Sequence, residues 1–230
     1  MSAPRIDAVL FDFGMVLSGP PNPEAWARMR TLTGLDEDRL HRAYWEYRHD
    51  YDRATLTGPA YWNAVVAHAG LTIDQSQLSD LLALDVDLWT DLNLPMVEWA
   101  QRLQRAGIRT GILSNIGDCI ADGIVAKFPW LSGFAHCTWS HALFMAKPEA
   151  AIFLQTAEAL QTAPAHILFI DDRPENVAAA AAVGMQAVQY TTHAAFEREM
   201  LDRGFGSLLD AGLRTQDQNA ALPTADLSAQ

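Results

Sequence analysis

Short apolar runs recur along the chain, and each is followed by polar or turn-forming residues. Four such runs, rich in strand-forming side chains, occupy positions 6–11, 109–113, 167–170 and 186–190. Runs of this length are typical of strands that are buried on both faces of a sheet. Stretches of helical composition lie between the later runs, at 118–128, 149–160 and 174–183. This alternation predicts an α/β fold, a doubly wound parallel sheet with helices on both faces.

The alternation is interrupted after the first run. The intervening segment opens with the helix-breaking sequence SGPPNPE and then shows helical patterning at 25–32, 36–51, 59–69 and 75–89. Thr57 stands at the N-cap position of the third of these helices. We therefore expect an all-helical domain at 18–93, inserted into an α/β core domain made of residues 1–17 and 94–213.

Composition fits an ordinary globular protein of this plan. The chain has 230 residues, of which 50% are hydrophobic and 19% are charged. A further helix is predicted at 95–106, ahead of the second strand. The segment 214–230 is polar and small-sided without an apolar period, so we expect a poorly ordered tail there.

Charge and cysteine content exclude several classes of partner. Acidic residues outnumber basic ones by 28 to 16, which gives a net charge of -12, and no block of Lys and Arg occurs. Nucleic acids and anionic membranes are therefore not expected partners. The two cysteines make neither a disulfide framework nor a zinc finger, and no apolar stretch reaches the roughly 18 residues of a membrane span. We expect a soluble, cytoplasmic protein, either a monomer or a homodimer.

Polar residues of a restricted set follow the apolar runs. Asp12 follows the first run, Ser114 and Asn115 follow the second, and Asp171 and Asp172 follow the third. Ligands of open α/β sheets bind at the carboxyl ends of the strands. The sequence therefore predicts that these side chains meet at one edge of the sheet.

Lys147 is a further candidate for the same edge. It precedes a predicted helix and is one of just two lysines, with Lys127, in a chain that otherwise uses arginine. Clustered carboxylates repel one another without a cation, and oxygen ligands suit Mg²⁺. Hydroxyl, amide and ammonium donors beside a metal recognise an anion such as phosphate, and a carboxylate held among them can attack phosphorus. Each residue alone has an ordinary role as a turn or cap residue; their joint order makes the case.

In this order the motifs resemble those of the haloacid dehalogenase-like hydrolase superfamily, over residues 5 to about 205. The match is closest to its phosphatase branch, which has a Rossmann-like core and a helical cap inserted after the first strand. VLFDFGMVL matches the first motif and GILSN the second. The resemblance implies that Asp12 is the nucleophile and that Ser114, with Asn115 beside it, binds phosphate.

The third and fourth motifs complete the resemblance. AKPEAAIF implies that Lys147 binds the phosphoryl oxygens and keeps the nucleophile ionised. ILFIDDRPENVAAAAAVGM implies that Asp171 and Asp172 bind metal, with Asn176 in support. Together with Asp12 and the carbonyl of Gly14, these acids would hold Mg²⁺.

The first motif departs from the family's usual DxDxT. Gly14 replaces the second Asp, which in the family protonates the leaving group and later activates water. Glycine retains the carbonyl for the metal but not the proton transfer, whose loss costs on the order of 10² to 10⁴ in rate. A branch of the family with FDxGxV at this position, which includes phosphatases, resembles the chain better.

We expect a Mg²⁺-dependent hydrolase of small phosphomonoesters that works through an aspartyl-phosphate intermediate. Two alternatives remain open: a metal-independent 2-haloacid dehalogenase, which also lacks the second Asp, and a phosphate-binding module without turnover. The inserted domain would cover the site and choose the substrate. Its candidate contacts are Trp45, Arg48, His49, Arg53 and Trp62.

Overall fold

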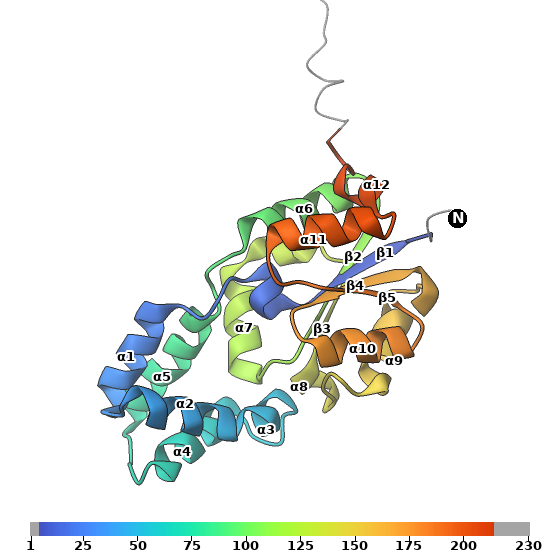
Figure 1. Ribbon diagram of the computed structural model, residues 1–230. Helices are drawn as coiled ribbons and strands as arrows, with labels where there is room; N and C mark the ends of the chain where they lie inside the picture. The colour runs from blue at the N-terminus through green and yellow to red at the C-terminus, as the bar shows by residue number, and fades with distance from the viewer. Residues whose placement is uncertain (1–4, 214–230) are drawn as a thin grey trace, which may run out of the picture.

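The computed structural model describes residues 5–213 and contains a five-stranded parallel sheet (Figure 1). The strands lie in the order β3-β2-β1-β4-β5. Their bounds are Ala8–Phe11 for β1, Arg109–Ser114 for β2, His136–Trp139 for β3, Ile167–Asp171 for β4 and Gln186–Gln189 for β5. The predicted doubly wound α/β fold is confirmed. The tail predicted at 214–230 lies outside the described residues.

Helices cover both faces of the sheet because successive residues of a strand point to opposite sides. Val9 and Phe11 of β1 belong to one apolar cluster, with helices α6 (Leu94–Arg105), α7 (Asp118–Lys127) and α11 (His193–Asp202). Ala8 and Leu10 belong to the other cluster, with α9 (Ala150–Ala159) and α10 (Pro174–Ala182). Both faces of β1 are therefore dry, which explains its unbroken apolar sequence.

Strand β3 is not among the four predicted strands. Its sequence, HCTW, is half polar, and its residues are mostly half-buried because it lies at the edge of the sheet. A short edge strand carries no continuous apolar run, so it lacks the pattern that reveals the central strands. Two short helices, α8 (Ser140–Leu143) and α12 (Gly206–Leu209), complete the core.

The segment after the first strand forms five helices, which we call the cap and which lie together on one side of the α/β core (Figure 1). The N-cap side chains Asn22, Asp36, Thr57 and Asp74 each accept a hydrogen bond from a first-turn amide. The helices are α1 (Pro23–Thr33), α2 (Glu37–Glu46), α3 (Arg48–Asp52), α4 (Gly58–His68) and α5 (Gln75–Leu88). None of the helices within residues 5–213 has the length and hydropathy of a membrane span.

The sequence pattern predicts a single helix at 36–51, but the structure breaks it at Tyr47. Beyond the break, the buried Arg48 guanidinium donates to the carboxylate of Asp52 at 2.8 Å and to the hydroxyl of Tyr44. The guanidinium also lies 3.7 Å from Asp85 of α5, a tertiary contact that competes with the local pattern for one continuous helix.

The aromatic residues of the cap are packed around a buried carboxylate. Asp85 accepts hydrogen bonds from the hydroxyl of Tyr44 at 2.8 Å and from the indole of Trp62 at 3.1 Å. Burial raises the pKa of Asp85 to about 6, against the opposing effect of the nearby Arg48. Both aromatic side chains are fully buried, so the cap has a polar centre that is closed to solvent.

Close packing and ion pairs join the cap to the core. Helix α5 crosses α7 so closely that a Cβ atom on Gly123 would lie 2.5 Å from a methyl carbon of Val86. Arg53 of the cap pairs with Glu149 at the start of α9 and donates to the carbonyl of Phe144 at 3.1 Å. The close packing of α5 against α7 therefore requires glycine at position 123.

We expect Gly123→Ala to lower the free energy of unfolding by about 1–2 kcal/mol, because overpacking outweighs the gain in helix propensity. Val86→Ala removes the methyl groups that the new Cβ would meet. In that background the same substitution should be neutral or stabilising, which urea unfolding of the four proteins measures. Equal effects of Gly123→Ala in both backgrounds would show that the α5–α7 contact does not limit residue 123.

Candidate active site

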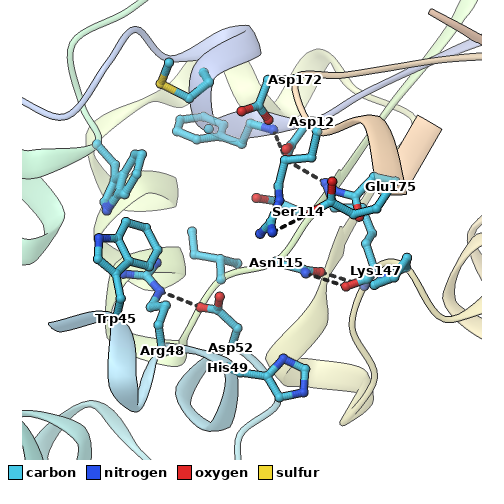
Figure 2. Close-up of a pocket in the computed structure, with 18 of the residues that line it drawn as sticks. Asp12, Trp45, Arg48, His49, Asp52, Ser114, Asn115, Lys147, Asp172 and Glu175 are labelled. Atoms are coloured by element: carbon cyan, nitrogen blue, oxygen red, sulfur yellow. Dashed lines mark hydrogen bonds and ion pairs between the residues drawn. The ribbon is translucent and has the colours of Figure 1, made fainter. Parts of the chain in front are cut away.

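A pocket of about 530 Å³ lies between the cap and the carboxyl ends of the central strands. Figure 2 shows Asp12, Ser114, Asn115, Lys147 and Asp172 on its core side. The register of the sheet explains why they meet: Phe11 of β1 pairs with Ile112 of β2 and Ile170 of β4. The polar residues that follow these positions therefore emerge at one edge, as predicted.

Asp12 follows the last residue of β1 and is held by its neighbours. Its backbone N–H donates to the carbonyl of Ile170 at 2.8 Å, and its Oδ1 accepts from the N–H of Phe13 at 2.7 Å. The same Oδ1 lies 2.9 Å from Nζ of Lys147. Only 7% of the residue's surface is exposed, so one carboxylate edge is anchored at the wall of the pocket.

The Lys147 ammonium lies between two carboxylates. Its Nζ is 2.9 Å from Asp12 and 2.6 Å from Asp171. The side-chain amide of Asn115 accepts from the N–H of Lys147 at 2.8 Å and donates to its carbonyl at 2.9 Å. Because both polar atoms of the Asn115 side chain are used in these two hydrogen bonds, any phosphate contact from residue 115 would come from its backbone N–H.

Asp171 forms the floor beneath the pocket and is fully buried. Its carboxylate accepts from Nδ2 of Asn176 at 2.9 and 3.1 Å, from the N–H of Arg173 at 2.8 Å and from Lys147. Asn176 thus lies where a supporting residue was expected. Asp172 is half-buried and lines the pocket itself, so it is the more accessible member of the acidic pair.

Negative charge is in excess at this edge of the sheet. Asp12, Asp171 and Asp172 each offer an oxygen atom within 4.8 Å of the others, while Lys147 supplies one positive charge. Burial raises the pKa of Asp12 to about 8; Lys147 opposes this shift and Asp171 adds to it. Burial lowers the pKa of Lys147, but the two carboxylates outweigh burial and raise it. The cluster therefore favours binding of a further cation.

In the turn after Asp12, glycine occupies a position that does not need it, and the next position, which favours glycine, holds methionine. Gly14 has φ -62° and ψ 135°, which any residue can adopt, and a Cβ there would meet only ring carbons of Trp89 at 3.8 and 3.9 Å. Met15 has φ 60° and ψ -3°. That left-handed conformation costs a residue with a side chain about 1–2 kcal/mol. The chain therefore has methionine where the backbone favours glycine.

Three of the five cap residues predicted to contact substrate line the pocket: Trp45, Arg48 and His49, which Figure 2 shows on the cap side. The structure does not bring the other two there. Trp62 is fully buried in the cap interior, because its indole is bonded to Asp85. Arg53 is turned toward Glu149 instead.

Sequence reasoning missed several residues of the pocket wall, among them Met15, Asp52 and Trp89. The left-handed backbone of Met15 has no pattern in the sequence. The ion pair of Asp52 with Arg48 has i,i+4 spacing, a signal that could have drawn attention to Asp52. Trp89 ends the last cap helix, where an aromatic residue is equally typical of packing. Ser114, at the end of β2, is buried and lines the pocket beside Asp12 and Lys147.

Comparisons with known proteins agree with this fold. The family described as "Hydrolase: haloacid dehalogenase-like hydrolase" matches residues 6–184. Drimenol cyclase drtB from Aspergillus calidoustus is 25% identical over 224 residues, which cover 93% of this chain but 39% of that protein. The chain thus spans about two fifths of the length of this curated relative.

Solved structures show the same architecture at low identity. The HAD family enzyme bt-2542 from Bacteroides thetaiotaomicron has a TM-score of 0.72 at 18% identity, covering 85% of this chain and 98% of that one. A further structure of it, with magnesium and inorganic phosphate, has a TM-score of 0.68 at 19% identity, covering 82% and 96%. L-2-haloacid dehalogenase from Xanthobacter autotrophicus has a TM-score of 0.64 at 18% identity, covering 91% and 88%.

We expect Lys147→Met to lower the free energy of unfolding by about 3 kcal/mol at pH 8, because it leaves two buried carboxylates without their cation. Loss of Lys147 raises the pKa of Asp12 further, so the folded mutant takes up protons that the unfolded chain releases. The penalty should therefore be smaller at pH 5.5 than at pH 8. Urea unfolding at both pH values measures the difference.

The other lysine provides the matched control. Lys127 pairs with Asp87 at 3.0 Å, with both side chains almost half exposed. Lys127→Met should change the free energy of unfolding by less than about 0.5 kcal/mol at either pH. Similar penalties for the two variants would contradict the assigned role of the buried ammonium.

Proposed function

The chain belongs to the haloacid dehalogenase-like hydrolases, and from this premise we propose that it is a Mg²⁺-dependent phosphatase of small phosphomonoesters. The observation that carries the proposal is the acidic pair at the end of β4. Asp171 and Asp172 lie beside Asp12, and the negative charge of the three carboxylates exceeds the positive charge of the one lysine. A binding site for a divalent cation accounts for that excess, and a phosphate ester is the ligand that such a site recruits.

The donor set fits magnesium. All three side chains supply carboxylate oxygens, the hard ligands that Mg²⁺ prefers. Asp12 and Asp172 line the pocket. The backbone carbonyl of Gly14, two residues after Asp12, would be a further ligand of the ion. Asp171 would either bind the ion as well or support the other ligands from below. When bound, Mg²⁺ would offset carboxylate charge and polarise a phosphoryl oxygen. The structure of the bt-2542 enzyme with magnesium and inorganic phosphate supports this ligand pair by analogy.

The residues of the chain divide the reaction between them. The Lys147 ammonium and the Ser114 hydroxyl bind the phosphoryl oxygens. The two hydrogen bonds from the Asn115 side chain hold the backbone of Lys147 in place. Oδ2 of Asp12 attacks phosphorus as the bond to the leaving alcohol oxygen breaks, and that oxygen takes a proton from water because residue 14 supplies none. Water then cleaves the aspartyl phosphate, which releases inorganic phosphate and restores the carboxylate.

Dehalogenation is the competing function within the family. Its structural neighbour, the L-2-haloacid dehalogenase, shares the fold at 18% identity. A 2-haloacid is itself an anion, however, and a site with three carboxylates and one ammonium repels it unless a metal is bound. The acidic pair therefore favours a phosphate ester over a 2-haloacid as the substrate. A binding module without turnover would keep the same metal site, and the retained Asp12–Lys147 pair argues for catalysis.

We expect phosphate release from p-nitrophenyl phosphate to require Mg²⁺ and to stop with EDTA, and no chloride release from 2-chloropropionate. Asp12→Asn should reduce kcat at least about 10⁴-fold because the amide is not a nucleophile. Its melting temperature should match the parent, and the exposed substitution Asp80→Asn should leave both properties unchanged. Chloride release that persists in EDTA would establish the dehalogenase, and tight phosphate binding without release would establish the binding module.

We expect Gly14→Asp to raise kcat for alkyl phosphates by about 10-fold or more, because it supplies the missing proton donor. The backbone at 14 accepts a Cβ, with ring carbons of Trp89 in ordinary contact. p-Nitrophenyl phosphate, whose leaving group needs no proton, should gain little. Gly14→Asn is the matched control without an acid; equal rates for the two variants would show that residue 14 does not limit the reaction.

A further inference from the structure

Apolar side chains form one wall of the pocket beyond the acidic cluster, and Arg48, His49 and Asp52 also line the pocket from the cap. Phe13, Met15 and Pro21 line it from the turn and linker after β1, and Trp45 and Trp89 line it from the cap. Met15 and Trp45 are 38% and 45% exposed, although both are large and apolar. Exposed apolar surface is thus gathered at the place where a substrate's leaving group would lie.

The backbone of Met15 strengthens this observation. A methionine is kept in a left-handed conformation directly after Gly14, which does not need to be glycine for its own φ and ψ. Strain of this kind persists where the side chain serves the site. The apolar Met15 side chain therefore lines the pocket three residues after the nucleophile, at a cost in backbone energy.

Trp89 also presents carbon to the pocket. Its indole N–H donates to the hydroxyl of Tyr44 inside the cap at 3.2 Å. The opposite edge of the ring, Cζ3 and Cε3, is the nearest neighbour of the Cβ position of Gly14. The hydrogen-bonding atom of this residue is thus already used, and what remains for a ligand is hydrocarbon.

The arginines that line the pocket are already paired. Arg48 donates to Asp52 at 2.8 Å and lies 3.7 Å from Asp85, so two carboxylates face one guanidinium. Arg173 contacts Glu175 at 2.5 Å, in a pair whose side chains are 62% and 43% exposed, so the two are weakly bound to each other. The buried Arg48 offers little attraction for a second phosphate or a carboxylate on the substrate.

From these contacts we propose that the substrate is a phosphomonoester whose leaving group is an apolar alcohol, alkyl or aryl, held by Met15, Trp45 and Trp89. The inference rests on the proposed phosphatase function and adds its substrate class. Polyhydroxylated and polyanionic leaving groups are disfavoured, because they would lose water without gaining hydrogen bonds or ion pairs at this wall.

The test compares kcat/KM of the full chain with Mg²⁺ for methyl, propyl and hexyl phosphate and for glycerol 3-phosphate. Each buried methylene should raise kcat/KM roughly three- to fourfold until the wall is covered. Propyl phosphate should exceed glycerol 3-phosphate, which has the same carbon number, at least tenfold. Glycerol is the better leaving group chemically, so this preference has to come from the pocket.

Variants of the wall provide the second arm. Met15→Gly and Trp45→Ala should each reduce the ratio of kcat/KM for hexyl over methyl phosphate about tenfold. Met15→Gly removes the strained side chain and Trp45 is largely exposed, so neither should unfold the protein. Leu201→Ala, an exposed apolar residue on α11 away from the pocket, is the control and should leave the ratio unchanged.

The outcomes separate the inference from the function on which it rests. A flat chain-length series, a preference for glycerol 3-phosphate, or ratios that are unchanged in both wall variants would overturn the apolar leaving group while p-nitrophenyl phosphate is still hydrolysed. Absence of phosphate release from every ester, p-nitrophenyl phosphate included, would overturn the phosphatase and the inference together.

Discussion

One buried ammonium between two carboxylates organises this protein. Three parallel strands bring acids to one edge of the sheet, and Lys147 is the cation that makes their burial tolerable. The position of Lys147 depends on the hydrogen bonds between its backbone and the Asn115 side chain. It also depends on Asp171, whose carboxylate accepts a hydrogen bond from Asn176. The balance remains negative, because three carboxylates are grouped around this one ammonium. A site built in this way is stable as a fold and still favours an additional cation, which is the property that catalysis on phosphate esters needs.

The cap differs from the core in that its buried charged residues lie away from the acidic cluster. Two of its charged residues, Asp85 and Arg48, are buried in its interior. Asp85 is bonded by Tyr44 and Trp62, and Arg48 lies close by. On the side that faces the pocket, Trp45 and Trp89 lie beside the polar residues His49 and Asp52. Helix α5 packs tightly against α7 of the core, and this side of the cap lies over the pocket that holds Asp12. In the proposed function, residues of the core bind the phosphoryl group, while Trp45 and Trp89 of the cap supply apolar contact to the leaving group.

The departures from the family's first motif lie where the two domains meet. Gly14 removes a proton donor and leaves space that the ring of Trp89 borders. Met15 takes a left-handed backbone that suits glycine and exposes its side chain to the pocket. Membership in the haloacid dehalogenase-like hydrolases accounts for the aspartate, the lysine and the acidic pair. Gly14 agrees with the FDxGxV pattern that the chain resembles, whereas that pattern leaves position 15 open, so Met15 is a feature of this chain.

The sequence by itself determined the elements of the core and the residues of the acidic edge. Buried parallel strands leave continuous apolar runs, and parallel strands must end together, so the order of residues along the chain is enough to bring Asp12, Ser114, Lys147 and Asp171 to one edge. The edge strand β3, the break at Tyr47 and the pocket wall could not be placed in this way. Which face of a cap helix meets the pocket, and why Trp45 lines it while Trp62 is buried, depends on how α2 and α4 pack on their neighbours. Helical periodicity marks an apolar face but not its partner, and only tertiary packing decides between solvent, core and substrate.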